Sequence, residues 1–211
     1  VNLQNGLVAH YPFCGNANDE SGNGNDGTVY GATLTTDRFG NPNSAYDFDG
    51  NAKILALIPA SYSPSASNFY TFSLWFNTDI IATSKLIMQY KGGQNPINTS
   101  NYDLISSHGS CSAGSIAIQN YPFNNPSACS PTILNTAIWT HIYVVFDQVL
   151  GLVKVYKNGL LWFNGPIGNS PPLAGYLAFG NNYDSGFEFN GQIDDISIHN
   201  RALTESEIQQ L

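Results

Sequence analysis

Clusters of Gly, Asn and Ser divide this chain into short runs of β-forming residues along its whole length. Many such runs with turn residues between them predict an all-β fold, an antiparallel sandwich of two sheets. Lys157-Asn158-Gly159-Leu160 places Asn-Gly between two runs, which is the strongest short signal for a hairpin with a type I′ turn. The expected strands are Gly6–Phe13, Ala45–Phe48, Phe69–Asn77, Lys85–Tyr90, Tyr102–Ser106, Ser115–Gln119, Trp139–Asp147, Leu152–Lys157, Leu160–Asn164, Tyr176–Gly180 and Gln192–His199.

One short helix is expected, at the C-terminal end. Thr204 can cap its first turn while Glu207 reaches back to the backbone of Thr204, as in a capping box. Leu203 before the cap and Ile208 after it can form a hydrophobic staple. We expect this helix to pack on the sandwich and to end a single domain that covers residues 1–211.

Composition and charge narrow the possible partners. Hydrophobic residues make up 42% of the 211 residues and aromatic residues 13%, enough for a sizeable core. The net charge is −8, and the seven Lys and Arg residues stand singly, so nucleic acid is not an expected partner. No apolar run approaches the roughly 18 residues of a membrane helix, so no membrane span is expected.

The three cysteines differ in their surroundings. Cys111 and Cys129 flank a segment rich in Ser, Asn and Pro, where a disulfide would stabilise the fold by roughly 3 kcal/mol. The alternative is two free thiols in a reducing cytoplasm. Cys14 follows an apolar run and is expected as a small buried hydrophobic residue.

The most unusual charges are the adjacent carboxylates Asp194 and Asp195, which lie inside an apolar strand pattern. Asp194 has the same strand parity as Ile196 and Ile198, so it is expected to point toward the core side and Asp195 to the opposite face. Burying such a charge is costly unless something positive neutralises it, which points to a bound cation. The alternative is that Asp194 caps buried backbone amides.

A second group of oxygen-bearing side chains lies in the turn-dense stretch 18–27. Its glycines allow sharp turns, Asp19 supplies a carboxylate, and Ser21, Asn23 and Asn25 supply neutral oxygens of the kind that calcium binds. By itself the stretch reads as an ordinary Asn/Gly turn.

Five segments in order resemble the laminin-G-type, concanavalin A-like jelly-roll modules. The resemblance rests on residues 6–13 with 18–27, 72–75, 139–141, 154–159, and 189–196 with 200–204. It implies a structural calcium between the early loop and the final strand, with Asp19, Asp194 and Asp195 as ligands and further oxygens from Ser21, Asn23 and Asn25. The chain departs from a minimal module between about Lys91 and Asn135, where an individual specificity is expected.

Catalysis is not expected. Glycosidases need two carboxylates that face each other across the sugar, and no such pair is evident. The four histidines have no adjacent nucleophile motif such as G-x-S-x-G, and His141 is expected to be structural. Trp75 and Trp139 are expected in the core.

The sequence therefore predicts a non-catalytic extracellular recognition module, secreted or on the cell surface, that binds carbohydrate and belongs to a larger multidomain protein. The alternatives are an adhesion or spacer domain that binds protein partners, and a glycan-active enzyme. Aromatic and amide side chains near the middle loops are the expected ligand-binding residues, namely Tyr90, Gln94, Asn95, Tyr102, Tyr121, Asn182 and Tyr183.

Overall fold

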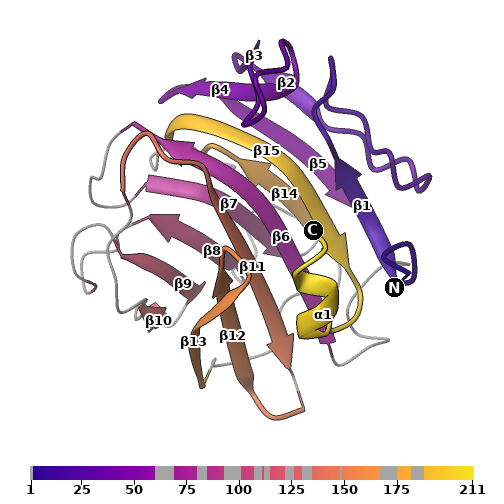
Figure 1. Cartoon of the computed structure of the whole chain (residues 1–211), viewed down its shortest axis with the longest axis vertical. Helices are drawn as coiled ribbons and strands as arrows, with labels where there is room; N and C mark the ends of the chain where they lie inside the picture. Colours follow the sequence, from indigo (N-terminus) through magenta and orange to yellow (C-terminus); the bar gives the residue numbers. More distant parts are fainter. Residues whose placement is uncertain are drawn as a thin grey trace.

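The computed structural model describes most of the chain. It covers residues 2–59, 69–79, 85–92, 101–106, 111, 115–121, 126–129, 135–147, 149–166, 175–181 and 188–211. Two antiparallel sheets pack face to face, as predicted, and a short helix lies near the C-terminus (Figure 1). Among the described residues, no helix is long and apolar enough to span a bilayer.

The first sheet has eight strands and joins the two ends of the chain. Its strand order is β13-β12-β11-β6-β15-β4-β3, and β1 pairs with β15 beside β4. The strands are β1 (Leu7–Tyr11), β3 (Thr33–Thr35), β4 (Ala45–Asp49), β6 (Phe69–Thr78), β11 (Thr140–Asp147), β12 (Leu152–Lys157), β13 (Leu160–Pro166) and β15 (Asn190–His199).

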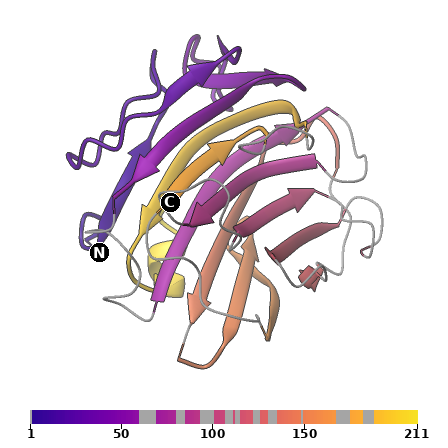
Figure 2. The same cartoon turned by 180° about the vertical axis from the view of Figure 1, so that it is seen from behind.

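The second sheet has seven strands and is seen from its own side in Figure 2. Its order is β10-β9-β8-β7-β14-β5-β2. The strands are β2 (Thr28–Tyr30), β5 (Lys53–Ile58), β7 (Lys85–Gly92), β8 (Asn101–Ser106), β9 (Ile116–Tyr121), β10 (Pro126–Cys129) and β14 (Gly175–Phe179).

Side chains along the central strands point alternately into the core and to the outer face of the eight-stranded sheet. In β6, Tyr70, Phe72, Leu74 and Phe76 belong to the core between the sheets. The residues between them, Thr71, Ser73 and Trp75, therefore lie on the outer face of the eight-stranded sheet. Trp75 is half-buried there, which corrects the prediction that it lies in the core.

A β-bulge in β15 changes the face that its acidic residues occupy. The register against β6 shifts between Asp194 and Ser197, and Asp195 has φ 45°. With the bulge, Ile193, Ile196 and Ile198 all reach the core, although strict alternation would put Ile193 on the other face. Asp194 pairs with Trp75 on the outer face, so the prediction that Asp194 points toward the core is wrong.

The helix α1 (Glu205–Ile208) packs on this same outer face (Figure 1). The predicted capping box is confirmed, because Thr204 Oγ1 accepts from Glu207 N and the Glu207 carboxylate accepts from Thr204 N. Leu203 and Ile208 form an apolar cluster with Tyr143, Val145 and Tyr156, so the staple residues also attach the helix to the sheet. Arg201 donates to both Glu207 oxygens, at 2.9 and 2.7 Å.

Candidate functional site

Arg38 neutralises the two adjacent carboxylates of β15. Its Nη1 lies 2.6 Å from Asp194 Oδ2, and its Nη2 lies 2.5 Å from Asp195 Oδ2. Both carboxylates thus reach one guanidinium on the outer face, whereas a regular strand would send them to opposite faces. The expectation of opposite faces is therefore wrong, because the bulge turns Asp195 toward the same cation.

Asp194 is the more buried of the two. Its side chain is 3% exposed, against 34% for Asp195. Burial and then the neighbouring Asp195 raise the pKa of Asp194 to about 7, while Arg38 acts in the opposite direction. The guanidinium is therefore what keeps a negative charge tolerable at this position.

Asp19 has other partners, all of them backbone amides. Its Oδ1 accepts from His10 N and Ser21 N, both at 2.9 Å, and its Oδ2 accepts from Asn25 N at 3.0 Å. Around it, Ser21, Asn23 and Asn25 all donate to the carbonyl oxygen of Val8. The side chains of this loop thus cap its own backbone amides and attach the loop to β1.

These contacts do not fit one calcium ion shared by the six predicted ligands. Each oxygen of Asp19 already accepts an amide hydrogen, the neutral side chains present N–H or O–H groups to Val8, and Arg38 occupies the Asp194–Asp195 pair. In the part of the chain described, no group of three or more His, Cys, Asp or Glu side chains could hold a metal. Calcium binding therefore remains a prediction, to be tested by measuring binding directly.

His10 connects the two predicted halves of that site. Its backbone N–H donates to Asp19, and its Nε2 lies 4.0 Å from Asp195 Oδ1. The early loop and the last strand are therefore neighbours, as the resemblance implies. The contacts that join them here are made by His10, with Asp19 on one side and Asp195 on the other.

A row of stacked rings extends from Arg38 across the outer face. The Arg38 guanidinium lies 4.6 Å from the centroid of the Trp75 ring, and Trp75 stacks on His141 with centroids 4.3 Å apart. His141 in turn lies against Tyr143, with centroids 3.9 Å apart. These rings come from the neighbouring strands β6 and β11, in which Trp75 and His141 are direct partners.

His141 is buried and fully hydrogen-bonded, as expected of a structural histidine. The Ser73 hydroxyl lies 2.8 Å from its Nε2, and the Tyr143 hydroxyl lies 2.6 Å from its Nδ1. Burial, with a smaller effect of Arg38, lowers the pKa of His141 to about 3. The ring is therefore neutral at physiological pH and is a poor general base there.

A pocket opens at the end of this row, between the sheet and the C-terminal segment. We call it the α1 pocket; its volume is about 260 Å³. Its lining residues are Trp75, His141, Tyr143, Asn158, Gly159, Ile208, Gln209 and Leu211. None of these eight side chains carries a charge at neutral pH, given the pKa of His141.

The Asn158-Gly159 turn fixes one wall of the α1 pocket. Both residues have positive φ, 50° and 78°, which confirms the predicted type I′ geometry. Asn158 Oδ1 accepts from His141 N at 2.8 Å, and Asn158 N donates to His141 O at 2.9 Å. The Asn158 carboxamide is thereby held in place while the residue remains exposed.

The residues predicted to bind ligand are not gathered in one described site. Tyr90 is 3% exposed and belongs to the core, which corrects its expected place at a surface site. In the strand register of the seven-stranded sheet, Tyr102 pairs with Tyr90, and Tyr121 pairs with Asn101. Gln94, Asn95, Asn182 and Tyr183 lie outside the described residues.

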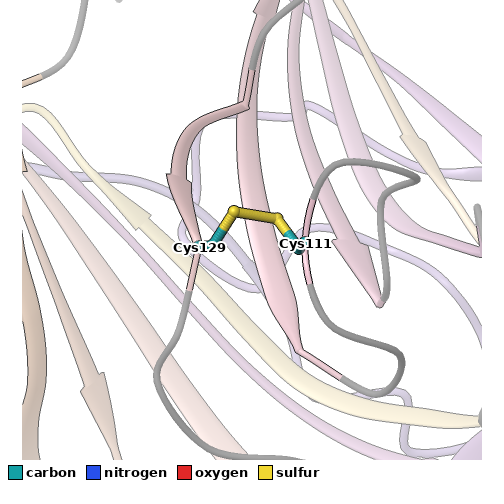
Figure 3. Close-up of a disulfide and its surroundings, with 2 residues drawn as sticks. All are labelled: Cys111 and Cys129. Carbon is teal, nitrogen blue, oxygen red and sulfur yellow. A yellow bond between two sulfur atoms is a disulfide. The ribbon is translucent and has the colours of Figure 1, made fainter.

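The predicted disulfide between Cys111 and Cys129 is confirmed (Figure 3). The two Cα atoms are 5.7 Å apart, and Cys111 packs against Leu86 and Ala117 of the seven-stranded sheet. Cys14 is free and exposed, so the expectation that it is a buried hydrophobic residue is wrong.

The family model of the concanavalin A-like lectin/glucanases superfamily matches residues 49–209. This chain belongs to that superfamily. The jelly-roll fold predicted from the sequence is therefore confirmed by both the structure and the family. No curated protein sequence matches the chain.

Several solved structures share the fold. Domain 4 of AbnA, a GH43 extracellular arabinanase from Geobacillus stearothermophilus in complex with arabinotriose, matches with a TM-score of 0.75 and 24% identity over 97% of both chains. The binding domain of Paraclostridial Mosquitocidal Protein 1 matches with a TM-score of 0.72 and 19% identity, over 99% of this chain and 52% of that one.

The binding domain of botulinum neurotoxin DC, in complex with rat synaptotagmin II, matches with a TM-score of 0.67 and 12% identity, over 99% of this chain and 51% of that one. This chain spans about half the length of the two toxin binding domains. At such identities the likeness establishes the fold alone.

Proposed function

We propose that this chain is a non-catalytic carbohydrate-binding module and that a neutral sugar binds in the α1 pocket. The observation behind the proposal is the lining of this pocket, in which three aromatic rings and two side-chain amides meet and no side chain carries a charge. Sites for small ligands combine apolar and aromatic walls with a few well-placed polar groups. A single sugar ring has these two kinds of surface.

The polar groups of the α1 pocket are prepared for hydrogen bonding. Asn158 is held by its two bonds to His141, so little side-chain entropy is lost when its free amide hydrogens meet a ligand. Gln209, the residue that follows α1, also lines the pocket and is exposed. The two amides can both donate to and accept from the hydroxyl groups of one sugar ring.

Relatives with this fold support a carbohydrate ligand. The AbnA domain was solved with arabinotriose, and another botulinum neurotoxin DC structure was solved with SialylT. A non-catalytic role is supported by the charges, because no residue that lines the α1 pocket has a carboxylate side chain and Arg38 holds Asp194 and Asp195. Retaining and inverting glycosidases both need two available carboxyl groups.

An adhesive role, with protein as the partner, is the second candidate. Its support is the exposed apolar surface of β13, where Leu160 and Leu161 are 73% and 51% exposed. β13 lies at an edge of the eight-stranded sheet, and an edge strand can accept a further strand. We place the module outside the cell, secreted or on the cell surface in a larger protein, with the disulfide as support.

A glycan array with wild-type protein and the Asn158→Asp variant tests the proposal. The substitution keeps an oxygen that accepts from His141 N and removes the amide donor. The expected result is a restricted set of neutral glycans bound by wild type and lost or weakened in Asn158→Asp. An array without a hit, together with binding to proteins or cells that Leu161→Asp abolishes, would favour the adhesive role. Hydrolysis of any arrayed glycan would contradict both.

A further inference from the structure

We infer that Arg38 is the resident cation of the Asp194–Asp195 pair and takes the place of a metal ion at the junction of the early loops with the last strand. The inference rests on the contacts of these three side chains and does not depend on the proposed sugar ligand. It predicts that this junction is stable without a divalent ion.

The geometry at the junction is that of a closed charge cluster. The guanidinium gives one terminal nitrogen to each carboxylate, and its side chain is only 12% exposed. Bonds between a guanidinium and carboxylates are short and strong for hydrogen bonds, and here they are largely shielded from water. A divalent ion at the same oxygens would have to displace Arg38.

Arg38 is also held on its other sides. Its guanidinium lies 4.6 Å from the centroid of the Trp75 ring and 4.4 Å from that of the Phe39 ring. The turn that carries it is fixed by Asp37, whose carboxylate accepts from the backbone of Phe39 and of Asn41 at 2.8 Å each. A cation placed so firmly loses little further freedom when it binds the carboxylates.

The bulge in β15 explains why one guanidinium can serve both residues. The positive φ of Asp195 brings two consecutive carboxylates to one side of the strand, where they would repel each other without a shared cation. Arg38 lies between β3 and β4, 156 residues away from Asp194 along the chain. The cluster therefore ties the N-terminal third of the sandwich to its last strand.

The experiment measures the melting temperature of the 211-residue chain in excess EDTA and in excess CaCl₂. For wild type the two values should agree within about 1 °C, since an ion that does not bind the native state does not stabilise it. Arg38→Ala should lower the melting temperature by about 6 °C or more, because the two neighbouring carboxylates lose the guanidinium that they share. Lys154→Ala, which removes an exposed cation on β12, is the matched control and should change little.

One further variant and a second measurement on Arg38→Ala keep the result interpretable. Arg38→Met combined with Asp194→Asn and Asp195→Asn leaves no unpaired charge and should recover part of the loss. In Arg38→Ala alone, the vacated carboxylates should gain a calcium-dependent stabilisation that wild type lacks.

Either of two results would overturn the inference. One is a calcium-dependent rise in the wild-type melting temperature that Asp194→Asn abolishes. The other is an Arg38→Ala loss no larger than that of Lys154→Ala. A rise that persists in Asp194→Asn and is lost in Asp19→Ala would place an ion in the early loop alone, and the assignment of Arg38 would stand.

Discussion

The indole of Trp75 and the imidazole of His141 stack with their ring centroids 4.3 Å apart and their planes at 25°. This contact joins two features of the outer face, because Arg38 covers Trp75 and the α1 pocket is lined by both rings. The charged cluster and the proposed sugar site therefore share one wall. The wall is neutral on the side of the pocket, since burial keeps His141 uncharged.

The buried His141 should make the fold sensitive to acid. Its pKa is lowered from 6.5 to about 3 in the folded state, so between these values the unfolded state binds the proton more readily. Stability contributed by neutral His141 is thus complete above pH 6.5 and is lost as the pH falls toward 3. Linkage gives a loss of about 3 kcal/mol between pH 6.5 and pH 4.

Urea unfolding of wild type and His141→Gln over this pH range measures the effect. The variant should be less stable at pH 7 and should lose less on acidification. Asp194 acts in the opposite direction, because a carboxyl whose folded pKa is raised to about 7 favours folding at low pH. It is present in both proteins, so the difference between the two curves isolates His141. Parallel curves would contradict this assignment.

Removal of the disulfide should weaken the fold without affecting the α1 pocket. Cys111 and Cys129 are 18 residues apart, and a closed loop of that length contributes about 3 kcal/mol in the chain-entropy model. The double variant Cys111→Ser/Cys129→Ser should show this loss in urea unfolding under oxidising conditions. Cys14→Ser, at an exposed free thiol, is the control and should stay within about 0.5 kcal/mol of wild type. Equal stability of all three proteins would contradict the role of the bond.

Gly191 should be intolerant of any side chain. Its φ of 141° is unfavourable for other residues, and a Cβ there would collide with the Asn77 carbonyl oxygen of β6. We expect Gly191→Ala to cost at least about 2 kcal/mol in urea unfolding. Gly40→Ala is the matched control, because Gly40 also has positive φ but open space around it. A loss no greater than that of Gly40→Ala would show that β15 can move away from β6.

Local signals in the sequence predicted much of the fold. The Asn158-Gly159 turn, the Thr204–Glu207 capping box and the strand alternation of β6 and β11 each depend on residues close together in the chain. β5 was missed although Ile54, Ala56 and Ile58 alternate into the core and Pro59 directly follows the strand. Tyr90 was misplaced because its nearness to polar loops outweighed its position in an alternating strand.

The site depends on non-local geometry, which the sequence does not reveal. The cost of burying Asp194 indicated a positive partner, and a bound ion was the expected partner because nothing local shows that Arg38 lies beside Asp194. The bulge at Asp195 reversed the expected faces, and strand parity alone cannot predict a bulge. A search for a cation within turns could have found Arg38, because few positive residues exist in this chain and Asp37-Arg38-Phe39-Gly40 is a turn sequence.

The most direct test of sugar binding in the α1 pocket is a calorimetric titration of the best array glycan into wild type, Asn158→Asp, Gln209→Ala and Tyr176→Ala. Tyr176 lies on the other sheet and serves as the control position. We predict saturable binding by wild type and Tyr176→Ala, and binding at least about tenfold weaker in both α1 pocket variants, a loss of about 1.4 kcal/mol. Binding that both pocket variants retain at full strength would contradict a sugar site in the α1 pocket, and loss only in Tyr176→Ala would move the site to the seven-stranded sheet.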